Sequence, residues 1–451
     1  MVLENKHISL PEAFCKRMER LLNGEFEDFN SALSELSPVS VRMNPLKKMT
    51  QFESAEIDDK VEWCSDGFYL KQRPIFTLDP CFHGGAYYVQ EASSMFLGYV
   101  LRQITDQQPL RVLDLCASPG GKTTLTASVL PEGSLLIANE VIQSRAAILK
   151  ENVIRWGYDN IVVSNNDPAD FRPLNGAFDI VIVDAPCSGE GMFRKERKAL
   201  EEWSEQNLAL CAARQKRILA DVWDSLKPDG FLIYSTCTYN PEENELITEW
   251  LLNNYDCKSV SVEHPYKTIT PTADNGYRFY PHKTRGEGFF ITVVQKGEGK
   301  VTIEKKSKKT PKIAMPKELA AMINPTVETD TYFKGNMCGI LPAAHTDFLK
   351  ELEKHLKITY KGCEMAEIFG NKYKLLHPLA LYVHLNKSAC NVLPLQLSDA
   401  LKYLRKEEIT ANNAKGDWIL LTFNDIALGW AKNIGNRLNN YFPKEWRIRM
   451  S

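Results

Sequence analysis

The sequence predicts an α/β fold: a doubly wound parallel sheet, preceded by an N-terminal α/β extension and followed by a mostly β C-terminal module. Three observations lead to this prediction. Continuous β-branched apolar runs, such as residues 180–183, are typical of strands buried on both faces. From residue 111 such runs alternate with helical patterns, which favours parallel strands joined by helices. After residue 330 this alternation gives way to short strands separated by turns.

The central segment is expected to hold the parallel sheet. Each apolar run ends at a polar, Gly or Pro residue, which sets the end of the strand. A Gly-rich turn at residues 116–124 separates the first strand from a helix. We expect strands at residues 111–115, 134–140, 161–163, 178–184, 231–236 and 288–294, and helices at 142–156 and 203–226.

The flanking segments are expected to form separate domains. Residues 297–316 are rich in charge and poor in apolar side chains, which is typical of a linker. The predicted division is an N-terminal α/β domain (1–106), a central domain that holds the parallel sheet (107–296), a charged linker (297–329) and a mostly β C-terminal module (330–451). In the flanks we expect helices at 10–22 and from 87–96 to about 102, and strands at 40–47, 373–376, 379–385, 417–423 and 426–432.

The composition is that of an ordinary globular protein, with 44% hydrophobic and 25% charged residues. No apolar run approaches the roughly 20 residues of a membrane span, and residues 1–6 do not resemble a signal peptide. The 11 cysteines include no Cys-x-x-Cys pair and form no metal-ligand pattern with the 8 histidines. We therefore expect a reducing, cytoplasmic location, free thiols and no structural metal.

Charge is unevenly distributed along the chain, although the net charge is only −2. Residues 300–451 contain 24 Lys and Arg against 15 Asp and Glu, so this part is basic while the rest is acidic. A basic C-terminal part favours an anionic partner, and an ordinary solvated surface is the alternative.

The turn at Cys116–Thr123 has the geometry of a nucleotide site, because it lies between a strand and a helix and contains Gly120 and Gly121. A P-loop would need a Gly where Cys116 stands, and the Gly-x-Gly-x-x-Gly pattern of dinucleotide sites is absent. Both phosphate-binding interpretations are therefore weak.

Acidic residues at successive strand ends indicate a different ligand. Asp114, Glu140, Asp167 and Asp184 each stand at or just after the end of a predicted strand. Carboxylates in these positions repel phosphates but suit a cation and a ribose, and S-adenosylmethionine combines both with an adenine. The alternative is that these acids cap helices.

Two thiols lie at the same edge of the predicted sheet as these acids. Cys187 follows Asp184-Ala-Pro, and Cys237 ends the run Phe231–Thr236. A single Cys is most often a small core residue. Two strand-end thiols beside an acid are instead typical of a site for nucleophilic catalysis.

These motifs resemble those of the RNA 5-methylcytosine methyltransferases of the NOL1/NOP2/Sun group. The resemblance rests on Leu113-Asp-Leu-Cys-Ala-Ser-Pro-Gly-Gly-Lys-Thr123, Asp184-Ala-Pro-Cys-Ser-Gly189 and Ser235-Thr-Cys-Thr238. Residues 429–432 and 437–447 resemble the PUA-like C-terminal domain of bacterial enzymes that modify small-subunit ribosomal RNA. The resemblance implies a Rossmann-like class I methyltransferase core that uses S-adenosyl-L-methionine. One departure is Ser118, where the family usually has Ala.

The resemblance also implies roles for individual residues. Cys237 would attack carbon 6 of cytosine, Cys187 would assist product release, and Lys122 would support Asp184, which lies between cofactor and base. DNA cytosine methyltransferases use the Cys of a Pro-Cys dipeptide as nucleophile. Pro186-Cys187 has this form, so Cys187 is the alternative nucleophile. The implied cofactor residues are Cys116, Ala117, Ser118, Pro119, Gly120, Gly121 and Lys122 around the methionine part, Glu140 at the ribose, Asp167 at the adenine, and Arg145 and Asp184 beside them.

The implied activity is methylation of cytosine carbon 5 in RNA, most simply in 16S ribosomal RNA or the small ribosomal subunit. A transfer RNA substrate, a DNA substrate, and a silent assembly factor that only binds ribosomal RNA are the alternatives. We expect no membrane partner, and a monomer is the default.

Overall fold

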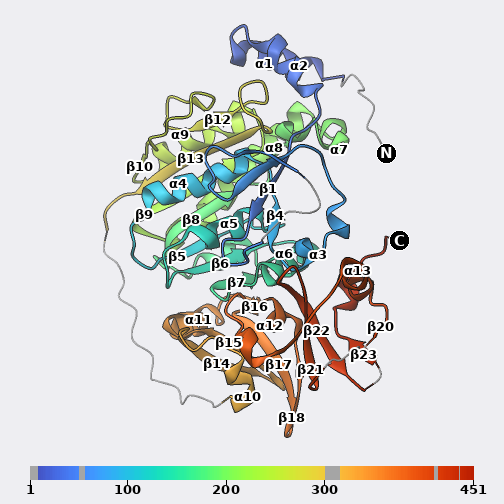
Figure 1. The fold of residues 1–451 in the computed structure, drawn as a ribbon. Helices are drawn as coiled ribbons and strands as arrows, with labels where there is room; N and C mark the ends of the chain where they lie inside the picture. Colours follow the sequence, from blue (N-terminus) through green and yellow to red (C-terminus); the bar gives the residue numbers. More distant parts are fainter. Residues whose placement is uncertain (1–8, 50–55, 300–314, 411–414, 436, 451) are drawn as a thin grey trace.

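The computed structural model describes residues 9–49, 56–299, 315–410, 415–435 and 437–450. Within them the strands form a 10-stranded central sheet and three smaller sheets (Figure 1). One small sheet belongs to the N-terminal part and two belong to the C-terminal part. The central sheet holds the predicted strand-end residues, so its topology positions the candidate site.

The middle of the central sheet is parallel, with the strand order β7-β6-β5-β8-β9. The order reverses between β5 and β8, so the turn after β5 and the loop after β8 leave the same edge side by side. Open α/β sheets bind ligands at such a switch point. These strands are β5 (Arg111–Asp114), β6 (Leu135–Asn139), β7 (Ile161–Ser164), β8 (Phe178–Asp184) and β9 (Leu226–Thr236).

Helices cover both faces of the parallel strands, as the doubly wound prediction requires. Alternate side chains of each strand face opposite cores: Ile182 packs with α4, α5 and α6, whereas Val183 packs with α8 and α9. Each fully buried Val or Ile contributes about 1.5–3 kcal/mol relative to an exposed one. The helices are α4 (Phe96–Ile104), α5 (Gly121–Val129), α6 (Gln143–Trp156), α7 (Arg197–Glu201), α8 (Glu205–Val222) and α9 (Glu245–Asn254).

Antiparallel strands extend the sheet on both sides. The predicted closing strand β13 (Phe289–Lys296) runs antiparallel to β9. At the other edge β16 (Ile358–Lys361), from the C-terminal part of the chain, pairs antiparallel with β7. The remaining strands of this sheet are β10 (Cys257–Ser259), β11 (Thr270–Pro271) and β12 (Tyr277–Phe279).

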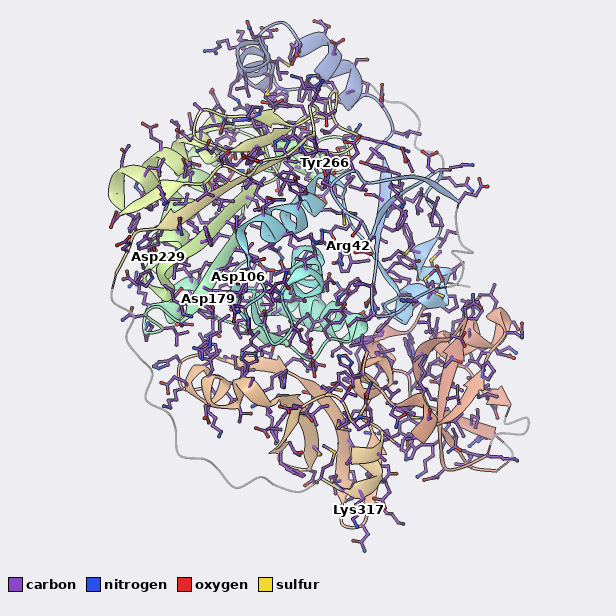
Figure 2. All side chains as sticks on the ribbon, turned by 60° about the vertical axis from the view of Figure 1, so that its left-hand side comes forward. Arg42, Asp106, Asp179, Asp229, Tyr266 and Lys317 are labelled. Atoms are coloured by element: carbon purple, nitrogen blue, oxygen red, sulfur yellow. The ribbon has the colours of Figure 1, made fainter. Side chains whose placement is uncertain are left out.

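The described N-terminal part contains three helices and a sheet of order β2-β3-β1-β4. The buried guanidinium of Arg42 in β1 joins this sheet to the core, since it donates to Thr124 Oγ1 of α5 at 2.6 Å and stacks on Trp156 (Figure 2). The elements are α1 (Glu12–Leu22), α2 (Phe26–Leu33), β1 (Val39–Met43), β2 (Ile57–Lys60), β3 (Gly67–Leu70), α3 (Pro80–His83) and β4 (Tyr87–Val89).

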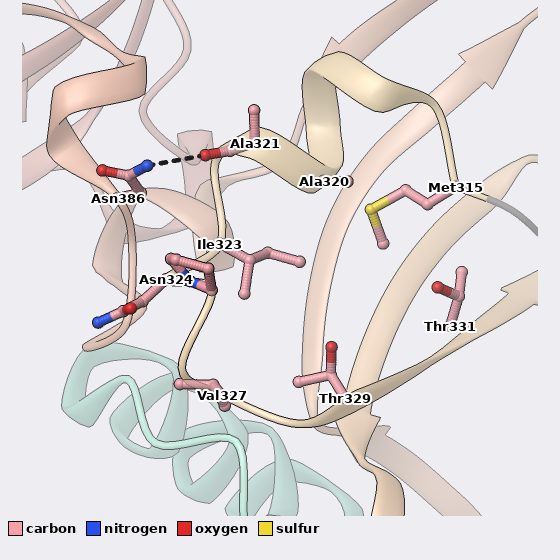
Figure 3. A pocket seen from close by; sticks show the side chains of 10 residues that line it. Met315, Ala320, Ala321, Ile323, Asn324, Val327, Thr329, Thr331 and Asn386 are labelled. Carbon is pink, nitrogen blue, oxygen red and sulfur yellow. Dashed lines mark hydrogen bonds between the residues drawn. The ribbon is translucent and has the colours of Figure 1, made fainter.

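The C-terminal part forms two sheets of order β14-β15-β17-β18 and β19-β21-β22-β23-β20. A pocket of about 410 Å³ lies where the segment after α10 passes β14, and there Asn386 donates to the Ala321 carbonyl (Figure 3). The strands are β14 (Thr329–Lys334), β15 (Met337–Pro342), β17 (Cys363–Phe369), β18 (Lys372–Leu375), β19 (Asn391–Pro394), β20 (Ile409–Thr410), β21 (Trp418–Phe423), β22 (Ile426–Asn433) and β23 (Arg437–Asn440). The helices are α10 (Lys317–Ala321), α11 (Thr346–Leu352), α12 (His377–Leu381) and α13 (Leu397–Arg405).

Two local predictions, a helix over residues 87–96 and a strand at 379–385, were wrong. Residues 87–89 form β4, which pairs with β1, and the helix begins only at Phe96. The predicted strand 379–385 begins inside helix α12, and Leu379 is buried there. Helix α10 lies within the predicted linker 297–329, of which residues 300–314 lie outside the described part.

Candidate active site

Asp184 ends β8 and is the centre of the site. The apolar residues before it, 180–183, are buried on both faces of the sheet. The strand therefore continues to the sheet edge and ends at the polar side chain of Asp184. The Nζ of Lys122 lies 2.8 Å from Asp184 Oδ2, and Ser235 Oγ of β9 donates to Oδ1 at 2.8 Å. The predicted contact between Lys122 and Asp184 is therefore present.

Lys122 stands in the first turn of α5 and connects the Gly-rich turn to the loop after β8. Burial disfavours its charge, but the adjoining Asp184 carboxylate outweighs this effect, so the pKa of Lys122 is raised. The ammonium also lies 5.1 Å from the ring centre of Phe289 in β13. A fixed cation therefore lies next to the strand-end acid and near Cys237.

The two predicted thiols meet at this edge, with the Sγ atoms of Cys187 and Cys237 3.2 Å apart. Their strands are parallel neighbours, with Asp184 opposite Ser235 in register, so the two loops leave the sheet together. The hydrogen bond with Cys237, together with burial, raises the pKa of the Cys187 thiol well above its usual range. A neutral Cys187 thiol is therefore favoured.

A buried acid that sequence reasoning missed connects the two cysteine loops. Glu243 follows Cys237 in a 3-10 turn, and its Oε2 accepts from the backbone N–H of Ser188 and from Gln215 Nε2, both at 2.9 Å. Gln215 also donates to the Pro186 carbonyl at 3.1 Å. The two peptides that flank Cys187 are thus held by Glu243 and Gln215. No local sequence pattern distinguishes Glu243 from its neighbouring acids.

The Gly-rich turn packs closely against its surroundings. Gly120 has φ 110°, a left-handed conformation that glycine adopts without strain, and α5 begins at the next residue. Ser118 Oγ donates to the Arg145 carbonyl at 3.0 Å, and Arg145 Nη2 donates back to the Ser118 carbonyl at 3.1 Å. Ser118, the residue that departs from the family pattern, therefore helps to attach the turn to α6. Burial raises the pKa of the Cys116 thiol, so this third cysteine is a neutral packing residue.

The other strand-end acids differ in their surroundings. Asp114 is fully buried and accepts from Thr123 Oγ1 at 2.6 Å, while its Oδ1 has no hydrogen-bond partner among the described residues. Burial raises the pKa of Asp114 to about 7. Glu140 Oε2 lies 3.5 Å from Arg145 Nε, and its Oε1 accepts from the N–H of Ile142. Asp167 caps a 3-10 helix through the N–H of Ala169, so the capping explanation applies to this acid.

The N-terminal helices pack against the loops that surround the thiols. Arg17 of α1 forms an ion pair with the buried Glu190, and Trp203 Nε1 donates to the same carboxylate at 2.8 Å. The N–H of Gly191 in turn donates to the Cys237 carbonyl at 2.9 Å. The contribution of α1 to the site gives no signal in the sequence, because it depends on long-range contacts.

Within the described residues, no group of three or more His, Cys, Asp or Glu side chains is arranged to hold a metal ion. Among the helices that the structure describes, none has the length and apolar character needed to cross a bilayer.

Three family models match separate parts of the chain. Residues 10–92 match the N-terminal domain of 16S rRNA methyltransferase RsmF, residues 100–295 match 16S rRNA methyltransferase RsmB/F, and residues 390–448 match the RsmF PUA domain. The chain is 29% identical to ribosomal RNA small subunit methyltransferase F of Vibrio atlanticus, over 97% of this chain and 98% of the relative.

Solved structures agree with these matches. A methyltransferase homologue from Pyrococcus horikoshii is 28% identical, with a TM-score of 0.56, and the match covers 64% of this chain and 96% of that one. NSun6 from Pyrococcus horikoshii, solved with SFG, shares the fold at 20% identity and a TM-score of 0.55, over 65% of this chain and 100% of that chain. Three consecutive family models and relatives matched along almost the whole chain point to one conclusion: the chain has the domain order of the RsmF-type 16S rRNA methyltransferases that it resembles, with the RsmF N-terminal domain, the RsmB/F methyltransferase domain and the PUA domain in succession.

Proposed function

We propose that this protein transfers a methyl group from S-adenosyl-L-methionine to carbon 5 of a cytosine in 16S ribosomal RNA, through a covalent bond between Cys237 and carbon 6. The observation that carries the proposal is the contact of Cys187 with Cys237, beside an ion pair that reaches back to the Gly-rich turn. The similarity to 16S rRNA methyltransferases of the RsmB/F and RsmF types supports both methyl transfer as the reaction and 16S ribosomal RNA as the substrate.

The donor set at the sheet edge fits S-adenosyl-L-methionine. The buried Oδ1 of Asp114 lacks a hydrogen-bond partner among the described residues, and the carboxylates of Glu140 and Asp167 follow the next two strands. Such acids suit a ligand with a cation and ribose hydroxyls. When bound, the cofactor supplies an electrophilic methyl group. The residues that would hold it are Cys116, Ala117, Ser118, Pro119, Gly120, Gly121, Lys122, Glu140, Arg145, Asp167 and Asp184.

Cys237 makes carbon 5 of the base reactive. Its thiolate adds to carbon 6, so a carbon–sulfur bond forms and the electron pair of the 5,6 double bond becomes available at carbon 5. The nearby ammonium of Lys122 favours the thiolate. As negative charge develops on N3 of the ring, N3 takes a proton from water, and Asp184, fixed by Lys122 and Ser235, accepts a hydrogen bond from the resulting N3–H.

Cys187 acts at the end of the reaction. A water molecule takes the carbon-5 proton, the electron pair of that C–H bond forms the 5,6 double bond again, and the bond between carbon 6 and sulfur breaks with its electron pair left on Cys237. The leaving Cys237 thiolate then needs a hydrogen-bond donor, and Cys187 is a protonated thiol 3.2 Å from it. Glu243 and Gln215 hold Cys187 at this distance by fixing the peptides on either side of it.

The flanking parts position the RNA. The target base must leave its stack to reach a thiol at a sheet edge. We assign substrate positioning to the N-terminal domain and RNA binding to the PUA-like module, which recognise shape and backbone charge. A monomer that acts in the cytoplasm, where ribosomal subunits assemble, is the simplest state for this function.

Trapping the covalent intermediate tests the proposal. Wild type, Cys187→Ala and Cys237→Ala are incubated with S-adenosyl-L-methionine and 16S ribosomal RNA, and denaturing gels are run. We expect methyl transfer by wild type and a stable protein–RNA band with Cys187→Ala alone. A band with Cys237→Ala would instead make Cys187 the nucleophile.

The substrate is tested with the same proteins. Assembled small subunits and transfer RNA replace naked 16S ribosomal RNA in parallel reactions. Methylation of transfer RNA alone would favour the transfer RNA alternative. RNA binding with neither methylation nor trapping on any substrate would favour a silent assembly factor.

A further inference from the structure

A groove of about 580 Å³ lies between the N-terminal part and α6, outside the residues assigned to the reaction. Aromatic rings and one arginine form much of its lining. Ile75, at its edge, exposes 57% of its surface, which is unusual for a large apolar side chain. The residues used below are Arg73, Ile75, Phe76, Phe82, Tyr88 and Asn152.

One wall of the groove touches the Gly-rich turn. Tyr88 OH and Asn152 Nδ2 both donate to the Pro119 carbonyl, at 3.3 and 2.8 Å. A Cβ atom at Gly121 would lie 3.3 Å from the Tyr88 ring, so this ring packs directly against the start of α5. A ligand in the groove would therefore lie beside the turn that leads to Lys122.

The opposite side of the groove reaches the C-terminal module. The guanidinium of Arg155 lies 5.3 Å from the ring centre of Phe82 and 5.3 Å from that of Trp446. Trp446 lies in the segment that matches the PUA domain. The groove is thus bordered by residues that contact the cofactor turn and by Phe82, which shares the Arg155 guanidinium with Trp446 of the module.

The chemistry of the groove suits a nucleobase with its phosphate. No carboxylate lines it, and Arg73, which lies 5.4 Å from the ring centre of Phe76, has no ion-pair partner among the described residues. Aromatic rings stack with unpaired bases of any sequence, and a nearby arginine pairs with the backbone phosphate. A small apolar metabolite would need no such cation.

We propose that this groove holds an unstacked base of the RNA substrate, on the side of the target cytosine that faces the C-terminal module, with Arg73 at its phosphate. This inference rests on the proposed function, since it assumes an RNA substrate. It assigns the groove a part in substrate binding and none in the chemical step.

The test measures RNA binding and methylation separately for Arg73→Ala, Tyr88→Ala and a matched control. Lys71→Ala is the control, because Lys71 is an exposed cation two residues from Arg73 and pairs with Glu56 outside the groove. For Arg73→Ala and Tyr88→Ala we expect Kd for 16S ribosomal RNA to rise about tenfold, with kcat at saturating RNA unchanged for Arg73→Ala. Arg73→Ala should also lower the slope of log Kd against log salt by about one.

Photocrosslinking locates the base directly. RNA that carries 4-thiouridine should crosslink to the peptide that contains Phe82 and Tyr88. The groove assignment is overturned if Arg73→Ala matches Lys71→Ala in Kd and salt slope, or if crosslinks map only elsewhere. If wild type binds RNA through the groove but does not methylate it, the proposed function fails while the groove assignment stands.

Discussion

The Sγ atoms of Cys187 and Cys237 lie 3.2 Å apart although they belong to loops that follow two different strands. The pair forms because β8 and β9 are parallel and in register at their last residues, so both loops leave the same edge. The hydrogen bond with Cys237 and burial raise the pKa of the Cys187 thiol, so a neutral Cys187 beside Cys237 is favoured. The trapping experiment decides which of the two thiols attacks carbon 6.

Lys122→Met should lower kcat by about 10²–10³, which is typical for the loss of one preorganised charge in an active site. The substitution removes the cation from Asp184 and from the neighbourhood of Cys237, so the thiolate of Cys237 becomes less favoured. Single-turnover formation of the protein–RNA adduct measures this effect. Lys122→Arg, which keeps the charge, should retain more activity; equal losses in both variants would contradict an electrostatic role.

Glu243→Ala should slow the reaction without weakening cofactor binding. It leaves the Ser188 N–H and Gln215 Nε2 without their buried acceptor, at a cost of about 1–3 kcal/mol in the free energy of unfolding. We expect kcat to fall about 10–100-fold, because Cys187 loses its fixed distance to Cys237. The control is Glu242→Ala, at the exposed neighbouring position, which should leave kcat and the free energy of unfolding unchanged.

A positioning role for Glu243 also predicts a change that simple destabilisation would not cause. The rate at which iodoacetamide alkylates Cys237 should depend on pH differently in Glu243→Ala than in wild type. The rates are measured at a temperature well below that of unfolding. An unaltered profile together with reduced stability would show that Glu243 is structural only.

Asp114→Asn should change the dependence of stability on pH. The folded-state pKa of Asp114 is raised to about 7 from an ordinary 3.8, so the folded state binds more protons than the unfolded state between these values. Stability of the wild type therefore falls as pH rises through this window. The variant lacks this loss. The difference between its free energy of unfolding and that of wild type should therefore shift in favour of the variant by up to about 4 kcal/mol between pH 4 and pH 8. Urea unfolding at several pH values measures this; parallel curves would refute it.

His377→Leu should change the same dependence in the opposite sense. His377 is buried against Phe442 and Trp446, and neither ring nitrogen has a hydrogen-bond partner among the described residues. Burial lowers the pKa of His377 to about 3, so below pH 6.5 the unfolded state binds more protons than the folded state. The free energy of unfolding therefore decreases as the pH is lowered below 6.5. The leucine variant should lose less stability at pH 5 than wild type. His355→Leu, at an exposed position, serves as control.

The parallel core and the strand-end residues were predictable because their signals are local. Uninterrupted apolar runs identified β5 to β9, and Asp184 and Cys237 follow from where those runs stop. The contact between Lys122 and Asp184 could be expected from the family resemblance and is present. The assigned roles of these residues remain predictions for the experiments above.

The errors arose where tertiary contacts decide the structure. Residues 87–89 (Tyr-Tyr-Val) favour a strand by composition, but three residues are too few to be separated by periodicity from the helix that follows, and they become β4 by pairing with β1. The short apolar run 379–385 does not distinguish strand from helix by its periodicity, and Pro378 in the first turn of α12 favours the helix. Glu243 is buried by elements far apart in the sequence, so its sequence neighbourhood does not reveal its function.

Strand β16 gives the C-terminal region a fixed distance from the catalytic edge. Because its backbone hydrogen-bonds to β7, the region continues the central sheet and cannot swing on its linker as an independent tether. Under the proposed function, RNA bound to this region therefore lies at a fixed distance from the catalytic edge, and we expect the target cytosine to be selected by its distance from the bound part of the RNA as well as by its sequence. The same pairing covers the β7 edge, so a protein cut at the linker would expose a strand edge that promotes aggregation.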